Sequence, residues 1–307
     1  MDNVLTVRGI SKKYNKTLVL NKVNMSIDRG DIYGFVGENG SGKTTIIRVI
    51  TGLIFPHEGD VELFGVNIKD ASITEVKSKL GAIVETPSIY PNMTAKENLL
   101  MQAEILNMKD LEKIDKILNE VGLCYLINDN KKAGNFSLGM RQRLGIAMAL
   151  VNDPEFLILD EPMNGLDPSG IVEIRELILK LNREKHITFL ISSHILSELS
   201  LIATKYGIIS KGRMIKEITS EDLKNACSKY VLISSSDNSL LSDVLRRHVN
   251  SEDIVSSYEG IRVYGDYDLN SLFKLFIENN IEIKTIQTVE TGIEEYYLQL
   301  INGKVVE

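Results

Sequence analysis

Two segments of this 307-residue chain carry residue types suited to phosphate chemistry. The first runs from Gly37 to Thr44 with the sequence GENGSGKT, between a β-rich run and a helical pattern. In such a loop, glycines let backbone N–H groups point at phosphates, a lysine reaches the terminal phosphates and a threonine hydroxyl binds Mg²⁺. We therefore expect a Mg-nucleotide as the ligand of this loop. The expected contacts of this region are Gly37, Asn39, Gly40, Ser41, Gly42, Lys43, Thr44 and Thr45.

The second segment places two carboxylates, Asp160 and Glu161, directly after the apolar run Phe156–Leu159. We expect Asp160 to hold the magnesium ion, directly or through water, together with Thr44. Glu161 then orients or deprotonates the attacking water, a role that contributes about 10²–10⁴ in rate. Small-molecule kinases, GTPases and helicases share these two segments, so they predict nucleotide chemistry without choosing among classes.

A third segment, Phe136–Leu144, narrows the choice. It resembles the signature of ABC ATPases, with Ser137 and the backbone of Gly139 at an expected helix N-terminus, where they could bind phosphate. The match departs from the usual pattern at two positions, where Leu138 replaces a glycine and Met140 replaces a glutamine.

Further elements follow the same family order between Tyr14 and Gly212. Tyr14 is similar to the aromatic that stacks on adenine, Asp167 ends a segment similar to the D-loop, and His194 resembles the switch histidine. The resemblance implies a Mg-dependent ATPase coupled to transmembrane transport. It also implies that two copies sandwich two ATP molecules, each bound by one copy's phosphate loop and the other copy's Ser137, and that separate permease subunits cross the membrane.

One departure, Glu85, narrows the subgroup. Most ABC ATPases have a glutamine at this position, which touches the magnesium site and leads to the surface that docks the permease. The run Gly81–Leu99 and the sequence of Ser137–Met140 resemble the ATPases of bacitracin-resistance and lantibiotic-immunity exporters. In those ATPases glutamate is common at the position of Glu85. We expect an inward-facing Glu85 that binds near magnesium and couples the nucleotide state to the permease.

The elements that must position these residues alternate between strands and helices. We expect an α/β fold of the ABC ATPase type over residues 1–220, with a core sheet and helices, an antiparallel β part and a helical signature subdomain. The expected strands are Asp31–Val36, Leu80–Val84, Phe156–Leu159 and Ile187–Ile191, and the expected helix starts are Thr94, in a capping box with Glu97, and Asp167, before Pro168.

Residues 221–307 predict a small accessory α+β domain. Tyr230–Ser234 and Ile261–Tyr264 are typical of strands. A helix is expected to bury Leu269, Leu272, Phe273 and Phe276 on one face, and a last helix is expected between Thr291 and Gly303.

Composition excludes several other classes. A formal charge of -7 argues against a general binder of nucleic acid, which needs clustered basic residues. Two cysteines, Cys124 and Cys227, form no pairing framework or metal-ligand spacing. We expect no export signal and no membrane span, and hence a cytoplasmic protein held at the inner face of the membrane through permease subunits.

The interpretation is an ATPase subunit of an exporter of antimicrobial peptides or related drugs. An exporter of another cargo, such as a lipid or polysaccharide, remains open. A non-transport ABC ATPase is a rival, although the chain has one cassette and no long coiled-coil insertion. A regulatory subunit that senses a ligand through residues 221–307 is a further alternative.

Overall fold

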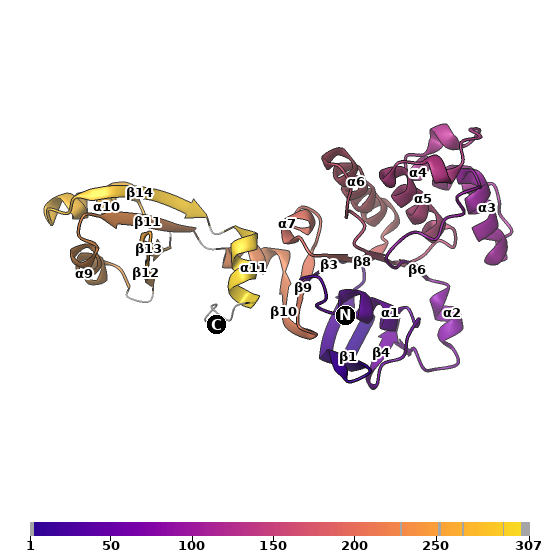
Figure 1. Ribbon diagram of the computed structural model, residues 1–307, viewed down its shortest axis with the longest axis horizontal. Coiled ribbons are helices and arrows are strands. Elements are labelled where there is room, and N and C mark those ends of the chain that lie inside the picture. Colours follow the sequence, from indigo (N-terminus) through magenta and orange to yellow (C-terminus); the bar gives the residue numbers. More distant parts are fainter. Residues whose placement is uncertain (1–2, 228, 251–252, 266, 291, 302–307) are drawn as a thin grey trace. The chain divides into compact units, whose positions relative to one another are not determined.

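The computed structural model describes residues 3–227, 229–250, 253–265, 267–290 and 292–301 (Figure 1). The chain divides into two compact units, Met1–Ser220 and Glu221–Glu307. Each unit has its own sheet and its own apolar core, so each is described by itself.

A six-stranded sheet forms the centre of the first unit, in the order β10-β9-β3-β8-β7-β6. Its neighbours pair in parallel except β10 with β9. The strands are β3 (Ile32–Val36), β6 (Leu80–Ile83), β7 (Phe156–Asp160), β8 (Thr188–Ser193), β9 (Lys205–Ser210) and β10 (Arg213–Thr219). The four strands expected in this region are confirmed, with ends shifted by one or two residues.

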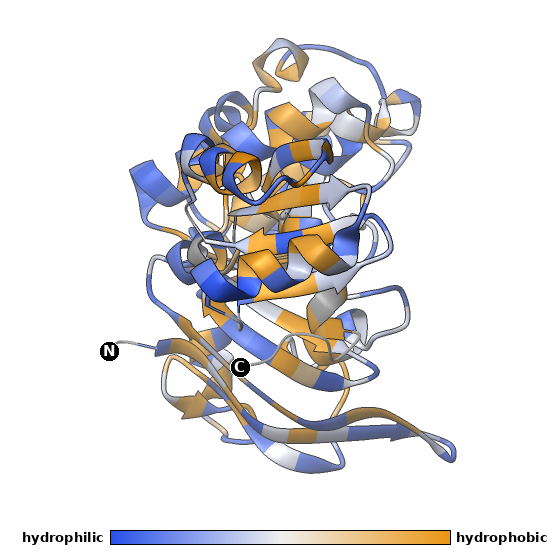
Figure 2. Ribbon diagram, turned by 90° about the vertical axis from the view of Figure 1, so that its left-hand side faces the viewer, coloured by the Kyte–Doolittle hydropathy of each residue, from blue (hydrophilic) through white to orange (hydrophobic). Residues whose placement is uncertain are grey.

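Strands β3, β7 and β8 are buried along their whole length, because helices or a second sheet cover both faces. The hydropathy colouring shows these central strands as mainly apolar (Figure 2). Since the carboxyl ends of parallel strands meet at one edge of a sheet, the loops that follow β3, β6, β7 and β8 converge there.

An antiparallel sheet packs beside the central one, in the order β2-β1-β4-β5. Its strands are β1 (Asn3–Tyr14), β2 (Thr17–Asp28), β4 (Glu58–Leu63) and β5 (Val66–Asn67). Helix α1 (Lys43–Ile50) contributes Ile46, Ile47, Val49 and Ile50 to a core that contains residues of both sheets. This burial fixes α1, and with it the loop that precedes it.

A helical part completes the first unit. Helix α5 packs against α3, α4, α6 and β6. The bounds are α2 (Ile73–Lys77), α3 (Ala95–Ile105), α4 (Lys113–Glu120), α5 (Leu138–Leu150), α6 (Pro168–Lys185) and α7 (Leu196–Leu199), with single 3₁₀ turns at Cys124–Leu126 and Ala133–Asn135. The predicted capping box of Thr94 and Glu97 is confirmed, and Asp167 caps α6 before Pro168 as predicted.

The second unit follows a split β-α-β pattern, with an antiparallel sheet in the order β12-β13-β11-β14. Apolar side chains of α9 and α10 pack on one face of this sheet and form its core. The elements are α8 (Ser220–Ala226), β11 (Lys229–Ser235), α9 (Asn238–His248), β12 (Ile254–Ser257), β13 (Gly260–Tyr264), α10 (Leu269–Glu278), β14 (Ile283–Glu290) and α11 (Ile293–Ile301).

One expectation about this unit is wrong. Phe273 was expected on the buried face of α10, but it is 41% exposed, while Leu272 and Phe276 are buried. The residues of α10 that pack against the core of this unit are Leu269, Leu272, Leu275 and Phe276. The last helix is present as α11, whereas its expected ends at Thr291 and Gly303 lie outside the described residues.

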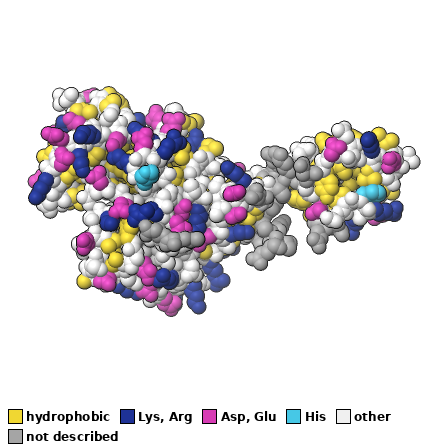
Figure 3. Space-filling model, turned by 180° about the vertical axis from the view of Figure 1, so that it is seen from behind, with side chains coloured by type: hydrophobic (Ala, Val, Ile, Leu, Met, Phe, Trp, Pro, Cys, Tyr) yellow, Lys and Arg dark blue, Asp and Glu magenta, His cyan; other side chains and the backbone are white. Residues whose placement is uncertain are grey.

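Two surface observations bear on partners. Across the described part of the chain, no helix has the length and apolar character needed to span a bilayer. On the face drawn in Figure 3, acidic and basic side chains of the first unit are interspersed rather than collected in one basic stripe.

Candidate active site

The loop from Gly37 to Gly42 leaves the carboxyl end of β3 and opens α1. Gly40 and Gly42 have positive φ values of 78° and 111°, which glycine adopts at little cost. A Cβ atom on Gly37 would lie 2.4 Å from the carbonyl oxygen of Ile209, so this position has room only for glycine. The sequence therefore folds locally into a closely packed loop with its backbone at the surface of the site.

This loop has the features of an anion cradle. No side chain caps the N-terminus of α1, so its first N–H groups are available to a ligand. The Ser41 hydroxyl is buried and, among the described residues, has no hydrogen-bond partner. A phosphate oxygen supplies the acceptor that these donors require, so the residues fit a nucleotide phosphate.

Lys43 lies in the centre of the site and is almost completely buried. Its Nζ donates to the carbonyl oxygens of Gly37 at 2.6 Å and Glu38 at 3.3 Å, and it lies 3.2 Å from Glu161 Oε1. The side chain is thus folded over its own loop, where its charge faces the same space as the backbone N–H groups.

Asp160 and Glu161 end β7 beside this lysine. Asp160 is 1% exposed, and its Oδ1 accepts a 2.5 Å hydrogen bond from the hydroxyl of Ser192 on β8. Glu161 Oε2 lies 2.8 Å from Nδ1 of His194. The structure therefore brings Lys43, Asp160, Glu161 and His194 together at the edge where β3, β7 and β8 end.

Magnesium fits this donor set. The Thr44 hydroxyl and the Asp160 carboxylate offer the oxygen ligands that Mg²⁺ prefers. Mg²⁺ commonly takes its other ligands from water and substrate phosphates. The described residues contain no cluster of three or more His, Cys, Asp or Glu side chains suited to a metal.

Ser137 and Asp167 lie in a second hollow, whose lining does not include Lys43, Asp160, Glu161 or His194. This hollow has a volume of about 300 Å³ and is also lined by Gly139 and Gly165. Ser137 caps α5 by accepting from the N–H of Met140 at 3.2 Å. The pKa of Asp167 is lowered by hydrogen bonds from the Ser169 hydroxyl and the Gly170 N–H, so this carboxylate is an anion at neutral pH.

The remaining candidate contacts are exposed or half-buried. Tyr14 ends β1 and is 43% exposed, with Lys12 Nζ 5.7 Å from its ring centroid. Asn39 is exposed, and Thr44 and Thr45 are half-buried in the first turn of α1. An exposed aromatic face of this kind is suited to stacking on a base.

Glu85 differs from expectation. Its carboxylate is 58% exposed and pairs with Nη2 of Arg48 at 2.6 Å rather than with the cluster around Lys43. The φ of Glu85 is +65°, and in this backbone conformation its side chain reaches Arg48 in the last turn of α1. The inward orientation expected of Glu85 is not found, because the guanidinium of Arg48 binds the carboxylate.

Sequence reasoning missed two residues. Ser192 was not among the expected site residues, yet its hydroxyl donates to Asp160 and accepts from the N–H of Glu161 at 2.9 Å. A polar residue at the end of an otherwise apolar strand was the available signal. Arg48 had no signal of its own, because only the fold brings it next to Glu85.

Comparisons with known proteins agree with this geometry. The family described as "ABC transporter" matches residues 20–164. The bacitracin transport ATP-binding protein BcrA of Bacillus licheniformis is 42% identical over 308 residues, covering 100% of both chains. The lantibiotic transport ATP-binding protein SrtF of Streptococcus pyogenes is 40% identical, covering 75% of this chain and 98% of its own.

Solved structures agree on the fold. The ATP-binding cassette MJ1267 of an ABC transporter, in its ADP conformation, matches with a TM-score of 0.66 and 30% identity, covering 74% of this chain and 95% of that one.

Proposed function

The chain belongs to the ATP-binding subunits of ABC transporters, a family of ATPases that power transport, and we propose that it drives export of a bacitracin-like peptide antibiotic. One observation carries this choice of cargo. The bacitracin relative matches the chain along its whole length and therefore includes the unit Glu221–Glu307. The lantibiotic relative leaves a quarter of the chain unmatched, which favours a bacitracin-like peptide over a lantibiotic.

In the proposed mechanism, the phosphate loop binds the triphosphate through the N–H groups of α1, the Ser41 hydroxyl and Lys43. Mg²⁺ supplies charge neutralisation for the phosphates when bound, held by Thr44 and Asp160. Glu161 accepts a proton from the attacking water. His194, hydrogen-bonded to Glu161 at 2.8 Å, orients that carboxylate.

We propose that the working form contains two copies of this chain. Ser137, Gly139 and Asp167 line a hollow apart from the loop of Lys43, so they are suited to the nucleotide of a second copy. Tyr14 would stack on the adenine. Closure over ATP and opening after hydrolysis then provide the movement that a membrane partner can use. In this proposal residues 1–220 are the nucleotide-binding domain and residues 221–307 the accessory domain.

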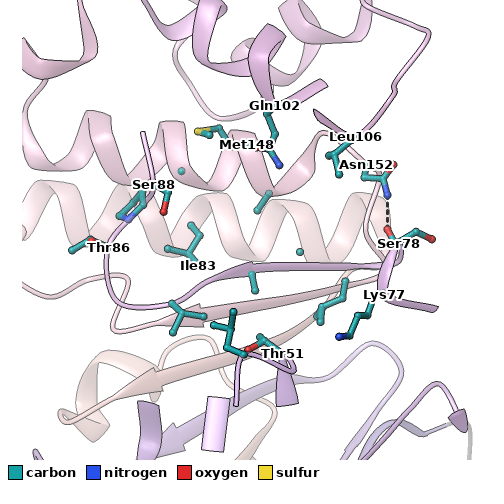
Figure 4. Close-up of a pocket in the computed structure, with 18 residues that line it drawn as sticks. Thr51, Lys77, Ser78, Ile83, Thr86, Ser88, Gln102, Leu106, Met148 and Asn152 are labelled. Atoms are coloured by element: carbon teal, nitrogen blue, oxygen red, sulfur yellow. Dashed lines mark hydrogen bonds between the residues drawn. The ribbon is translucent and has the colours of Figure 1, made fainter. Parts of the chain in front are cut away.

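The proposed partner is a separately encoded permease that holds the chain at the inner face of the membrane. A cavity of about 460 Å³ offers a docking place between β6 and the helices α3 and α5 (Figure 4). Its rim carries Leu53 and Leu106, which are 64% and 39% exposed. A short cytoplasmic segment of the permease with apolar side chains fits this surface, since exposed apolar groups commonly mark protein contacts.

Protection of a sensitive bacterial strain tests the proposal. The chain and its permease should raise the bacitracin concentration that stops growth, and the Glu161→Gln variant with the same permease should not. Protection that is unchanged in Glu161→Gln would contradict the ATPase mechanism. Protection against a lantibiotic but not bacitracin would contradict the proposed cargo. So would accumulation of a lipid or polysaccharide in cells with the Glu161→Gln variant, if resistance to both peptides stayed the same.

A further inference from the structure

The segment Val84–Ser88 leaves the carboxyl end of β6 and forms one wall of the cavity described above. Val84, Thr86, Pro87 and Ser88 line that cavity, and Thr86 and Ser88 lie along the same stretch of chain in Figure 4. Within the segment, Glu85 has the left-handed φ of +65° that non-glycine residues rarely adopt. Such a conformation persists only where the surroundings hold it, so contacts at both ends of the segment matter.

At one end, Glu85 is bound to the helix of the phosphate loop. Arg48 Nη2 lies 2.6 Å from Glu85 Oε1. Arg48 belongs to the last turn of α1, whose first turn carries Lys43 and Thr44. Because the other side of α1 is buried in the core between the two sheets, Arg48 must move together with the phosphate loop.

At the other end, the segment contacts the helix of the signature. A Cβ atom added to Gly145 of α5 would lie 2.6 Å from Cβ of Pro87, so the proline ring rests directly on the backbone of that helix. Helix α5 begins at the cap Ser137. The segment therefore touches both helices whose N-termini are suited to bind nucleotide phosphates.

We infer that Arg48 is a positioning residue, which clasps the segment Val84–Ser88 to α1 through its ion pair with Glu85. A displacement of the phosphate loop then passes through Arg48 and Glu85 to the wall of the permease cavity, and through Pro87 to α5. The role assigned to the cavity rests on the proposed function. The clasp itself is a property of this chain alone and can be measured without a permease.

Hydrogen exchange of residues 84–88 in the purified full chain tests the clasp. Arg48→Met and Glu85→Gln should each speed exchange in this segment, by about fivefold at most, because both partners are partly exposed. The reversed pair, Arg48→Glu with Glu85→Arg, should bring exchange back towards that of the original chain. Lys113→Met provides a matched control, because Lys113 of α4 and Asp153, between α5 and β7, form a pair of the same 2.6 Å length and similar exposure. It should leave residues 84–88 unchanged.

Unchanged exchange in both single variants would overturn the inference. So would a Glu85→Gln variant that changes the Mg²⁺ dependence of ATP hydrolysis while Arg48→Met leaves exchange and hydrolysis as they were, since Glu85 would then act on the metal site directly. A second measurement uses the complex with the permease, where Arg48→Met should reduce the stimulation of hydrolysis by bacitracin by about fivefold at most, as for loss of a partly exposed ion pair. If exchange responds but bacitracin never stimulates hydrolysis in the original complex, the clasp stands and the proposed cargo fails.

Discussion

Lys43 Nζ lies 3.2 Å from Glu161 Oε1, so the buried lysine of the phosphate loop and the half-buried candidate base form an ion pair across the site. A phosphate that binds Lys43 therefore competes with Glu161 for its positive charge. The pair therefore connects nucleotide binding to the position of the carboxylate that would receive the proton.

Glu161→Gln should separate binding from hydrolysis. The amide keeps the size of the side chain but cannot accept the proton, so hydrolysis should fall by about 10²–10⁴. ATP affinity should be kept or increased, since Lys43 loses an anionic competitor. Phosphate release and equilibrium binding of a fluorescent ATP analogue measure the two effects. A hydrolysis rate within tenfold of the original would remove Glu161 from the role of base.

Ser192→Ala should weaken the metal site. Its hydroxyl holds both Asp160 and the N–H of Glu161, and loss of such supporting contacts commonly costs about 10–100-fold in metal affinity. The Mg²⁺ concentration that gives half-maximal hydrolysis should rise accordingly. Ser193→Ala is the control, because that hydroxyl bonds Glu198 and the N–H of Ile195 instead. Equal effects of the two variants would count against the assignment.

Gly37→Ala should damage both folding and binding. The new Cβ would meet the backbone carbonyl of Ile209 at 2.4 Å, so the chain must shift, at a cost of about 1–3 kcal/mol in the free energy of unfolding. Gly65→Ala is a control for the substitution itself, because nothing lies within 4 Å of a Cβ there, although its φ of +80° also adds strain. Urea unfolding should show a larger loss of stability for Gly37→Ala than for Gly65→Ala. Only Gly37→Ala should lose ATP affinity in a binding measurement.

Glu155→Gln should reduce stability in a pH-dependent way. The side chains of Arg29 and then Lys79 hydrogen-bond this carboxylate and lower its pKa below the ordinary 4.5. A lowered pKa stabilises the folded state above about pH 4.5, and that contribution disappears as the pH falls through the folded value. At pH 7 the variant should lose about 1 kcal/mol or less, since the pairs are partly exposed.

Urea unfolding at pH 7, 5 and 4 checks this sign. The gap between the original chain and Glu155→Gln should be smaller at pH 4 than at pH 7. Glu184→Gln, at an exposed position of α6, should show no comparable trend. A gap that grows on acidification would contradict the lowered pKa.

Deletion of residues 221–307 should separate the ATPase from the cargo-dependent function. The first unit has its own core, so the shortened chain should fold and hydrolyse ATP. We expect protection against bacitracin to be lost, because the full-length match to the bacitracin relative includes this unit. Full protection by the shortened chain would show that the accessory unit is not needed for transport.

The parts of the site that the sequence predicts well are those encoded by local patterns. The phosphate loop, the carboxylates after β7 and the caps Thr94 and Asp167 depend on residues adjacent or three positions apart, and the structure has the expected loop, strand end and helix starts at these positions. Burial along β3, β7 and β8 follows from their continuous apolar runs in the same way.

Glu85 and Phe273 show where prediction from sequence stops. The partner of Glu85 is 37 positions away in the chain, on a helix whose orientation is set by packing between two sheets. Phe273 satisfies a helical period, but it is 41% exposed, and Leu275 packs against the core of the unit instead. Both outcomes depend on which surfaces meet, and one chain's pattern does not contain that information.

The pairing of β11 with β14 has a consequence for how the second unit could be gained or lost. Lys229, at the start of β11, is paired with Glu290, at the end of β14, so the first and last strands of this sheet run side by side. The chain enters and leaves the sheet at neighbouring points, and all four strands of the sheet come from this unit. Such a module needs no strand from the first unit to complete its sheet, so it can be transferred between chains as a whole.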